Sequence, residues 1–121
     1  MAIKRYTADK DNTITNALEN NLTTRGTGSN MGASDVLEVF SIYGQAFSSS
    51  SLSGVTKTQE LSRVLVQFPV TSIISDRSNE DIPMSGNVNF YLRLYNAKHG
   101  ETVPKGMTLS VVPVSSSWEE G

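Results

Sequence analysis

Eight consecutive residues, 88–95, constrain the fold of this chain more than any other feature of its sequence. Every second residue from Val88 to Leu94 is apolar, and the residues between them are polar or tyrosine. Alternation with a period of two is typical of a β-strand that buries one face. The apolar side comprises Val88, Phe90, Leu92 and Leu94, and the other side Asn89, Tyr91, Arg93 and Tyr95. We therefore predict a half-buried strand over 88–95.

The same reasoning predicts strands elsewhere in the chain. The segment 61–68 has apolar residues on both faces and ends at Pro69, which lacks the N–H that a ladder needs. The segment 36–43 is apolar on both faces and rich in β-branched and aromatic residues, which favours a central position in a sheet. Further strands are predicted over 3–8, 13–15 and 107–114.

The segments between these strands are polar. We predict one or two helical turns over 16–22 and no helix elsewhere. Residues 47–60 contain four consecutive serines and predict a flexible, protruding loop. Short strands separated by Gly, Ser and Asn turns indicate an all-β antiparallel sandwich or barrel. A length of 121 residues suits a single domain over 1–121, or the N-terminal part of one.

Composition narrows the possible functions. Ser, Thr and Asn supply 37 of the 121 residues, a bias that suits turns and solvated sheet faces. The net charge of −2 and the scattered basic residues offer no footprint for nucleic acid. No apolar run approaches the roughly 20 residues that span a bilayer, and residues 1–6 do not begin a secretory signal. We therefore expect neither nucleic acid nor a membrane as a partner.

The sequence offers no catalytic constellation, so we predict that the chain is not an enzyme. There is no cysteine, and the only histidine, His99, lies in predicted turn residues beside Gly100. The glycines of 26–32 lead into a predicted strand, whereas a dinucleotide-binding loop opens a helix. Glu119 and Glu120 are adjacent, and on a strand they would point to opposite faces. No cofactor is expected.

Two aspartates are weak candidates for a metal site. Asp9 and Asp11 stand at alternate positions and could offer hard oxygen ligands to Ca²⁺. No bidentate glutamate follows at the spacing of a known calcium loop, and we favour an ordinary polar turn as the interpretation of this cluster. We therefore expect no metal.

Four residues are candidates for binding a partner. Tyr91, Arg93 and Tyr95 form an aromatic–cation–aromatic row on the polar side of the 88–95 strand, and such rows bind sugars or proteins. They also occur where a second sheet or a neighbouring subunit covers the face, which we favour. Trp118 is either a core plug, the interpretation that we favour, or a platform for a sugar ring.

Several short motifs, taken in order, resemble the DNRLRE type of β-sandwich domain. These motifs are 6–9, 28–32, 37–39, 61–68, 88–95 and 115–121. The resemblance implies an antiparallel, jelly-roll-like sandwich that is often appended to surface proteins and sometimes linked to carbohydrate binding. The family pattern continues with further strands beyond its W-x-E-G motif, and the stretch 47–60 stands as an insertion. The sandwich is thus expected to be incomplete at its C-terminus.

A second resemblance covers residues 2–8, 22–35 and 37–46. These segments are similar to structural proteins of tailed bacteriophages, particularly those of marine cyanobacteria. The resemblance implies a virion protein of the tail, tail fibre, baseplate, neck or head periphery, assembled in the host cytoplasm. Its partners would be copies of itself and other virion proteins.

Two functions therefore stand. The first is a virion structural protein that acts by subunit packing, and the alternative is a carbohydrate-binding adhesion module that recognises a host-surface glycan. A sandwich cut after five or six strands leaves apolar faces and strand edges without partners. We expect either that the protein continues past Gly121 or that a neighbouring subunit supplies the missing packing.

Overall fold

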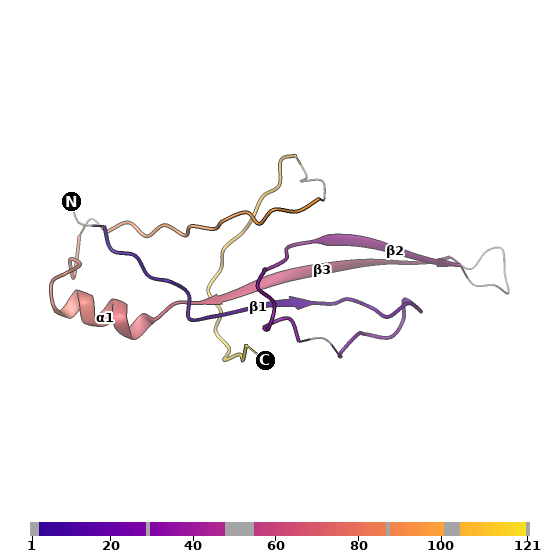
Figure 1. The fold of residues 1–121 in the computed structure, drawn as a ribbon, viewed down its shortest axis with the longest axis horizontal. Helices are drawn as coiled ribbons and strands as arrows, with labels where there is room; N and C mark the ends of the chain where they lie inside the picture. Colours follow the sequence, from indigo (N-terminus) through magenta and orange to yellow (C-terminus); the bar gives the residue numbers. More distant parts are fainter. Residues whose placement is uncertain (1–2, 29, 48–54, 87, 101–104, 121) are drawn as a thin grey trace.

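A computed structural model of the chain describes residues 3–28, 30–47, 55–86, 88–100 and 105–120. It contains three strands, β1 (Lys10–Thr15), β2 (Ser41–Phe47) and β3 (Val55–Gln67), and one helix, α1 (Val70–Ser78). The strands form one antiparallel sheet in the order β1-β3-β2 (Figure 1). Regular structure is mostly strand with little helix, which is consistent with the predicted all-β class. Among the described residues, no helix is long and apolar enough to span a membrane.

The sheet is narrow because β3 pairs with its two neighbours along different halves. β2 pairs with Val55–Leu61, where Ile42 faces Glu60, and β1 pairs with Ser62–Gln67, where Thr13 faces Val64. Nearly everywhere along β3, the sheet is therefore only two strands wide. An isolated two-stranded ribbon is marginally stable in water at best.

Two buried hydroxyl groups join the halves of the sheet. Thr13 is 2% exposed, and its hydroxyl accepts a hydrogen bond from the Glu38 N–H at 3.1 Å. The Ser62 hydroxyl accepts from the Phe40 N–H and donates to the Glu38 carbonyl, both at 2.7 Å. These bonds hold the segment before β2 against the centre of β3. Burial is sparse otherwise, since Ile82 is the one buried hydrophobic residue among those described.

The segment 61–68 is confirmed as a strand over 61–67, but β3 begins at Val55, inside the predicted loop over 47–60. Phe47 ends β2, and residues 48–54 of that loop lie outside the described residues. The run of serines and glycine suggested a loop, whereas the following residues are held by the pairing of β3 with β2. The strand predicted over 13–15 is confirmed within β1, which begins at Lys10.

The strand predicted over 36–43 is only partly confirmed. Residues 41–43 belong to β2, whereas 36–40 are joined to the sheet through the hydroxyl groups of Thr13 and Ser62. The predicted central position is wrong, because β2 is an edge strand. Apolar side chains on both faces indicated burial, but Ile42 and Tyr43 remain exposed.

The prediction of no helix outside 16–22 is wrong. Residues 16–22 form a turn in which the Asn21 side chain accepts hydrogen bonds from the N–H groups of Thr23 and Thr24. The helix forms instead after Pro69, although its β-branched residues favour strands by propensity. Residues 3–8, predicted as a strand, run alongside α1 without pairing in the sheet (Figure 1).

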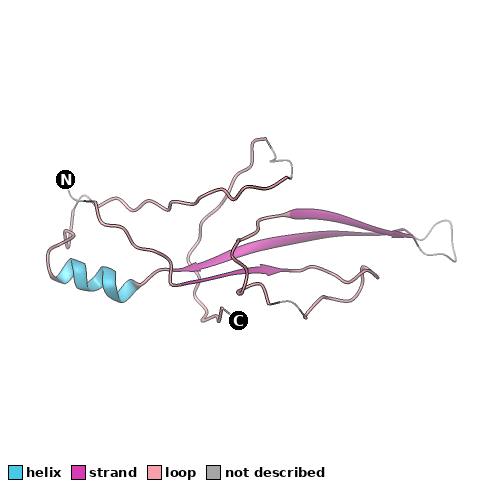
Figure 2. Cartoon of the chain, in the orientation of Figure 1, coloured by secondary structure: helices cyan, strands magenta, loops and turns pink. Residues whose placement is uncertain are grey.

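Residues 88–95 and 107–114 have extended backbones but belong to no sheet (Figure 2). Among the described residues, none from 89 to 118 takes part in a hydrogen bond; Val88 bonds only to the nearby Gly86 carbonyl, at 2.9 Å. The strands predicted over both segments are therefore not formed. The alternating pattern dictates two unlike faces, but a strand also needs a neighbour to supply a ladder.

Candidate interaction surface

The two extended segments, 88–95 and 107–114, carry many exposed apolar side chains. Phe90 is 66% exposed and Leu94 60%, although both lie on the side of 88–95 that was predicted to be buried. In 107–114 the apolar residues are exposed as well: Met107, Leu109, Val111, Val112 and Val114. Exposed apolar side chains that gather in this way make the two segments a candidate interaction surface.

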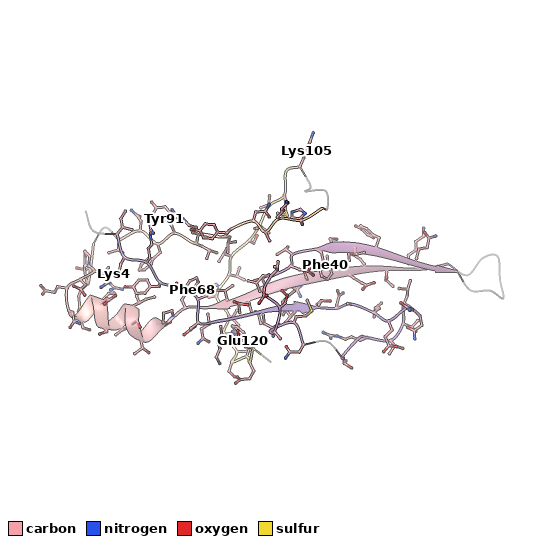
Figure 3. All side chains as sticks on the ribbon, viewed as in Figure 1. Lys4, Phe40, Phe68, Tyr91, Lys105 and Glu120 are labelled. Carbon is pink, nitrogen blue, oxygen red and sulfur yellow. The ribbon has the colours of Figure 1, made fainter. Side chains whose placement is uncertain are left out.

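Three of the four predicted binding residues lie on the other side of 88–95. Tyr91 is 87% exposed and Tyr95 83%, and Arg93 is exposed between them. Figure 3 shows Tyr91 well away from the sheet, on the same side of the molecule as the N-terminal segment. Trp118, the fourth, is half-buried near the C-terminus. Figure 3 shows Glu120, two residues further along, at the lower side of the sheet, away from Tyr91. The structure therefore does not bring Trp118 together with the tyrosine row.

Two shallow hollows of the described surface contain none of the predicted binding residues. One, of about 190 Å³, is bordered by Arg25 and Arg63 above the β1–β3 pair. The other lies beside α1 and Met84. No aromatic side chain lines either hollow, so neither offers the flat platform on which a sugar ring stacks.

The C-terminal residues lie against β1. The Asn12 amide donates to the Glu120 carbonyl at 3.1 Å, and the Glu120 carboxylate accepts from the Asp11 N–H at 3.4 Å. Lys10 contacts the Glu119 carboxylate at 3.5 Å. Gly32 passes so close to the Glu120 carbonyl that an added Cβ would overlap it. The outer side of β1 is thus occupied by the chain itself.

The weak calcium candidates gain no support from this arrangement. Asp9 is exposed, and Asp11 offers its backbone N–H to Glu120. Within the described ranges, no three His, Cys, Asp or Glu side chains are grouped so that they could hold a metal ion.

The outer edge of β2 is open. Its residues, SIYGQAF, carry no charge, and Ile42 and Tyr43 are 51% and 77% exposed. Among the described residues, β2 pairs only with β3. Natural proteins protect an exposed edge with lysine, proline, a bulge or a covering segment. β2 has none of these in the described part of the chain, so it is a second feature of an interaction surface.

Polar contacts fix the N-terminal segment to α1. The Tyr6 hydroxyl donates to Asp76 at 2.6 Å, and Lys4 contacts the carboxylates of Asp76 and Asp81 at 3.0 Å each. The hydrogen bonds from Tyr6 and then Lys4 lower the pKa of Asp76, and the bonds to Asp81 and Asp76 raise the pKa of Lys4. Desolvation, then the bond to Asp76, raises the pKa of Tyr6. Each shift favours the bonded form, so the cluster is a structural clamp.

Sequence reasoning missed the β2 edge and the clamp. The uncharged run SIYGQAF was visible, but its position at an edge depends on which strands pair. The clamp joins residues that are 70 to 77 positions apart, and no local pattern signals such a pair.

Comparison with protein-family models, curated proteins and solved structures finds no match to this chain.

Proposed function

We propose that this chain is a structural protein of a bacteriophage virion and acts by packing against other subunits, without catalysis. One observation carries the packing role. The chain exposes 10544 Å², whereas a compact monomer of 13.1 kDa exposes about 6,400 Å². The excess, about 4,100 Å² on one chain, is larger than the roughly 1,000–2,500 Å² that each partner of an obligate interface typically buries.

The virion assignment draws its support from the sequence. We propose that residues 2–8, 22–35 and 37–46 resemble structural proteins of tailed bacteriophages, although comparison with family models and curated proteins finds no match. Such a protein assembles in the host cytoplasm and needs neither a signal peptide nor disulfides. Its place would be the tail, baseplate, neck or head periphery. We further propose that the assembled form is a jelly-roll-like sandwich, in which a neighbouring subunit supplies the sheet missing from the described residues.

Particle incorporation tests this function. An antibody raised against the chain should label purified cyanophage particles in electron micrographs, and the chain should sediment with particles in a density gradient. Antigen that stays in the soluble fraction of infected cells, with unlabelled particles, would overturn the virion assignment.

A carbohydrate-binding module is the second candidate, and the exposure of Tyr91 and Tyr95 favours it specifically. Two exposed tyrosines beside an arginine suit stacking on a sugar ring and hydrogen bonding to its hydroxyls. On a glycan array, Tyr91→Ala and Tyr95→Ala should then abolish binding. Ile3→Ala, which removes an 80% exposed side chain outside the row and outside the sheet, is the control. Trp118→Ala tests whether the half-buried tryptophan takes part.

A further inference from the structure

The chain contains an open strand edge and a strand without a neighbour. β2 leaves one edge unpaired, and residues 88–95 are extended and amphipathic without any ladder. We propose that residues 88–95 of one copy add as a strand to the free edge of β2 in a second copy. The inference deepens the proposed function and rests on its subunit-packing part, but not on the phage assignment.

Of the two sheet edges, β2 is the one that can accept a strand. Contacts from Glu119 and Glu120 occupy the outer side of β1. β2 is uncharged along its seven residues and has no such cover among the described residues. Main-chain hydrogen bonds supply affinity when an extended segment joins a free edge.

Of the two extended segments, 88–95 is the better donor. Its eight residues match β2 in length, and it contains no proline, so every residue can donate to a ladder. The segment 107–114 contains Pro113, which suits only an outermost strand. In the assembled sheet it would suit the position next to 88–95 at the outer edge, where Pro113, which has no N–H, faces solvent.

The side chains on each face of β2 determine which side of 88–95 would continue each face of the sheet. Tyr43 shares a face with Gln59, whose amide donates to the Tyr43 hydroxyl at 3.3 Å. Tyr91, Arg93 and Tyr95 extend this polar and aromatic face. Phe90, Leu92 and Leu94 then lie on the face of Ile42 and its partner Glu60. Val64 and Val66 belong to the same face of β3 but lie in the half that pairs with β1. Slippage by one residue would reverse both matches.

The occupant is a second copy, because the chain supplies both partners but holds them apart. In Figure 3, Tyr91 lies near the α1 end of the molecule, and Phe40, just before β2, lies near its middle. The exposed area points the same way. An excess of about 4,100 Å² per chain is more than a standard interface covers, as expected when each copy both donates and accepts a strand. Exchange of identical elements between protomers is a low-cost route to such assemblies.

A complementation experiment tests the pairing in the full chain. Leu92→Pro blocks the donor strand but leaves β2 intact, and Ile42→Lys/Tyr43→Lys blocks the edge but leaves the donor intact. In sedimentation velocity, the wild-type chain should have at least twice the mass of the 13.1 kDa monomer, and each variant alone should be monomeric. Mixed in equal amounts, the two variants should form a 1:1 complex. Lys98→Pro and Val70→Lys, which carry the same substitutions elsewhere, should keep the wild-type mass.

Monomers in the mixture, or variants that assemble like the wild type, would overturn the proposal. Cross-linking keeps the test independent of the folding of the proline variant. The chain has no cysteine, so Tyr43→Cys can be combined with one cysteine at each position from 90 to 95. Disulfide dimers should form at 91, 93 or 95 and not at 90, 92 or 94, and dimers without this alternation would contradict the proposed faces. If strands exchange but particles are not labelled, only the virion assignment is refuted. If particles are labelled but strands do not exchange, only this inference is refuted.

Discussion

Lys4, Tyr6 and Asp76 hold the N-terminal segment against α1 mainly by charge and hydrogen bonding. The pKa of Asp76 lies below 3.8, and those of Tyr6 and Lys4 lie above 10.0 and 10.5. A lowered carboxyl pKa contributes stability above pH 3.8, and this is lost as the pH falls through the folded-state pKa. The raised pKa values of Tyr6 and Lys4 contribute stability below pH 10, which is lost as the pH rises through them. The clamp should therefore hold across the neutral range and open at both extremes.

The Tyr6 hydroxyl reports on this clamp. Asp76→Asn removes the carboxylate that favours the protonated phenol, so the pKa of Tyr6 should fall toward 10.0, with the effect of desolvation remaining. Tyrosinate absorbance at 295 nm measures the titration, with Tyr6→Phe identifying the Tyr6 contribution. Asp81→Asn is the control, because Asp81 has the weakest influence on Tyr6. An unchanged curve for Asp76→Asn would contradict the clamp.

The Ser62 hydroxyl joins β3 to the segment before β2 through two short hydrogen bonds. Ser62→Ala leaves the Phe40 N–H and the Glu38 carbonyl without this partner, which should lower the free energy of unfolding by about 1–3 kcal/mol. Urea denaturation measures the change. Ser41→Ala removes an exposed hydroxyl that accepts only a 3.5 Å bond, and it should change stability by less than about 0.5 kcal/mol. Equal effects of the two substitutions would show that the buried hydroxyl has no special role.

Among the elements, the β2–β3 ribbon depends on a close approach at Gly44. A Cβ at this position would lie 2.6 Å from the Thr58 hydroxyl oxygen and 3.0 Å from a Leu22 methyl carbon. The Thr58 side chain is short and its oxygen is buried, so it cannot move aside easily. Glycine thus lets the turn containing Leu22 pack onto the ribbon.

Gly44→Ala should lower the free energy of unfolding by about 1–3 kcal/mol, the usual cost of overpacking. Gly28→Ala is the matched control, because no atom lies within 4 Å of its added Cβ. The midpoint of urea denaturation reports both changes. A Gly44→Ala chain as stable as the control would show that this contact does not limit the packing of the ribbon.

At the scale of the whole molecule, we expect the large exposed surface of the chain to make its folding stability depend on association between copies. If copies pair as proposed, the folded state is an oligomer, and its stability rises with protein concentration. For a dimer, each tenfold increase in concentration adds about 1.4 kcal/mol. Calorimetry over a hundredfold range should show an unfolding temperature that rises steadily for the wild type and stays constant for Leu92→Pro. A constant temperature for the wild type would contradict association.

The sequence by itself determined the local preferences of most segments. The sequence patterns predicted the strand at 61–67 and the short strand at 13–15, whereas the strand and the buried face predicted over 88–95 are not formed. It did not reveal α1, where tertiary contacts to Lys4 and Tyr6 accompany a helix of strand-favouring residues. Nor did it identify the Val55 start of β3, which depends on pairing with β2.

Only the tertiary structure decided which strands have neighbours. A period of two specifies an extended backbone with an apolar face, and it says nothing of what covers that face. Among the described residues, β3 pairs on both sides and β2 on one side, whereas residues 88–95 pair with no strand. The same kind of pattern therefore accompanies a paired strand at 61–67 and an extended segment without a ladder at 88–95. The physical reason is that ladder hydrogen bonds and apolar burial form between segments, and they are properties of an assembled sheet.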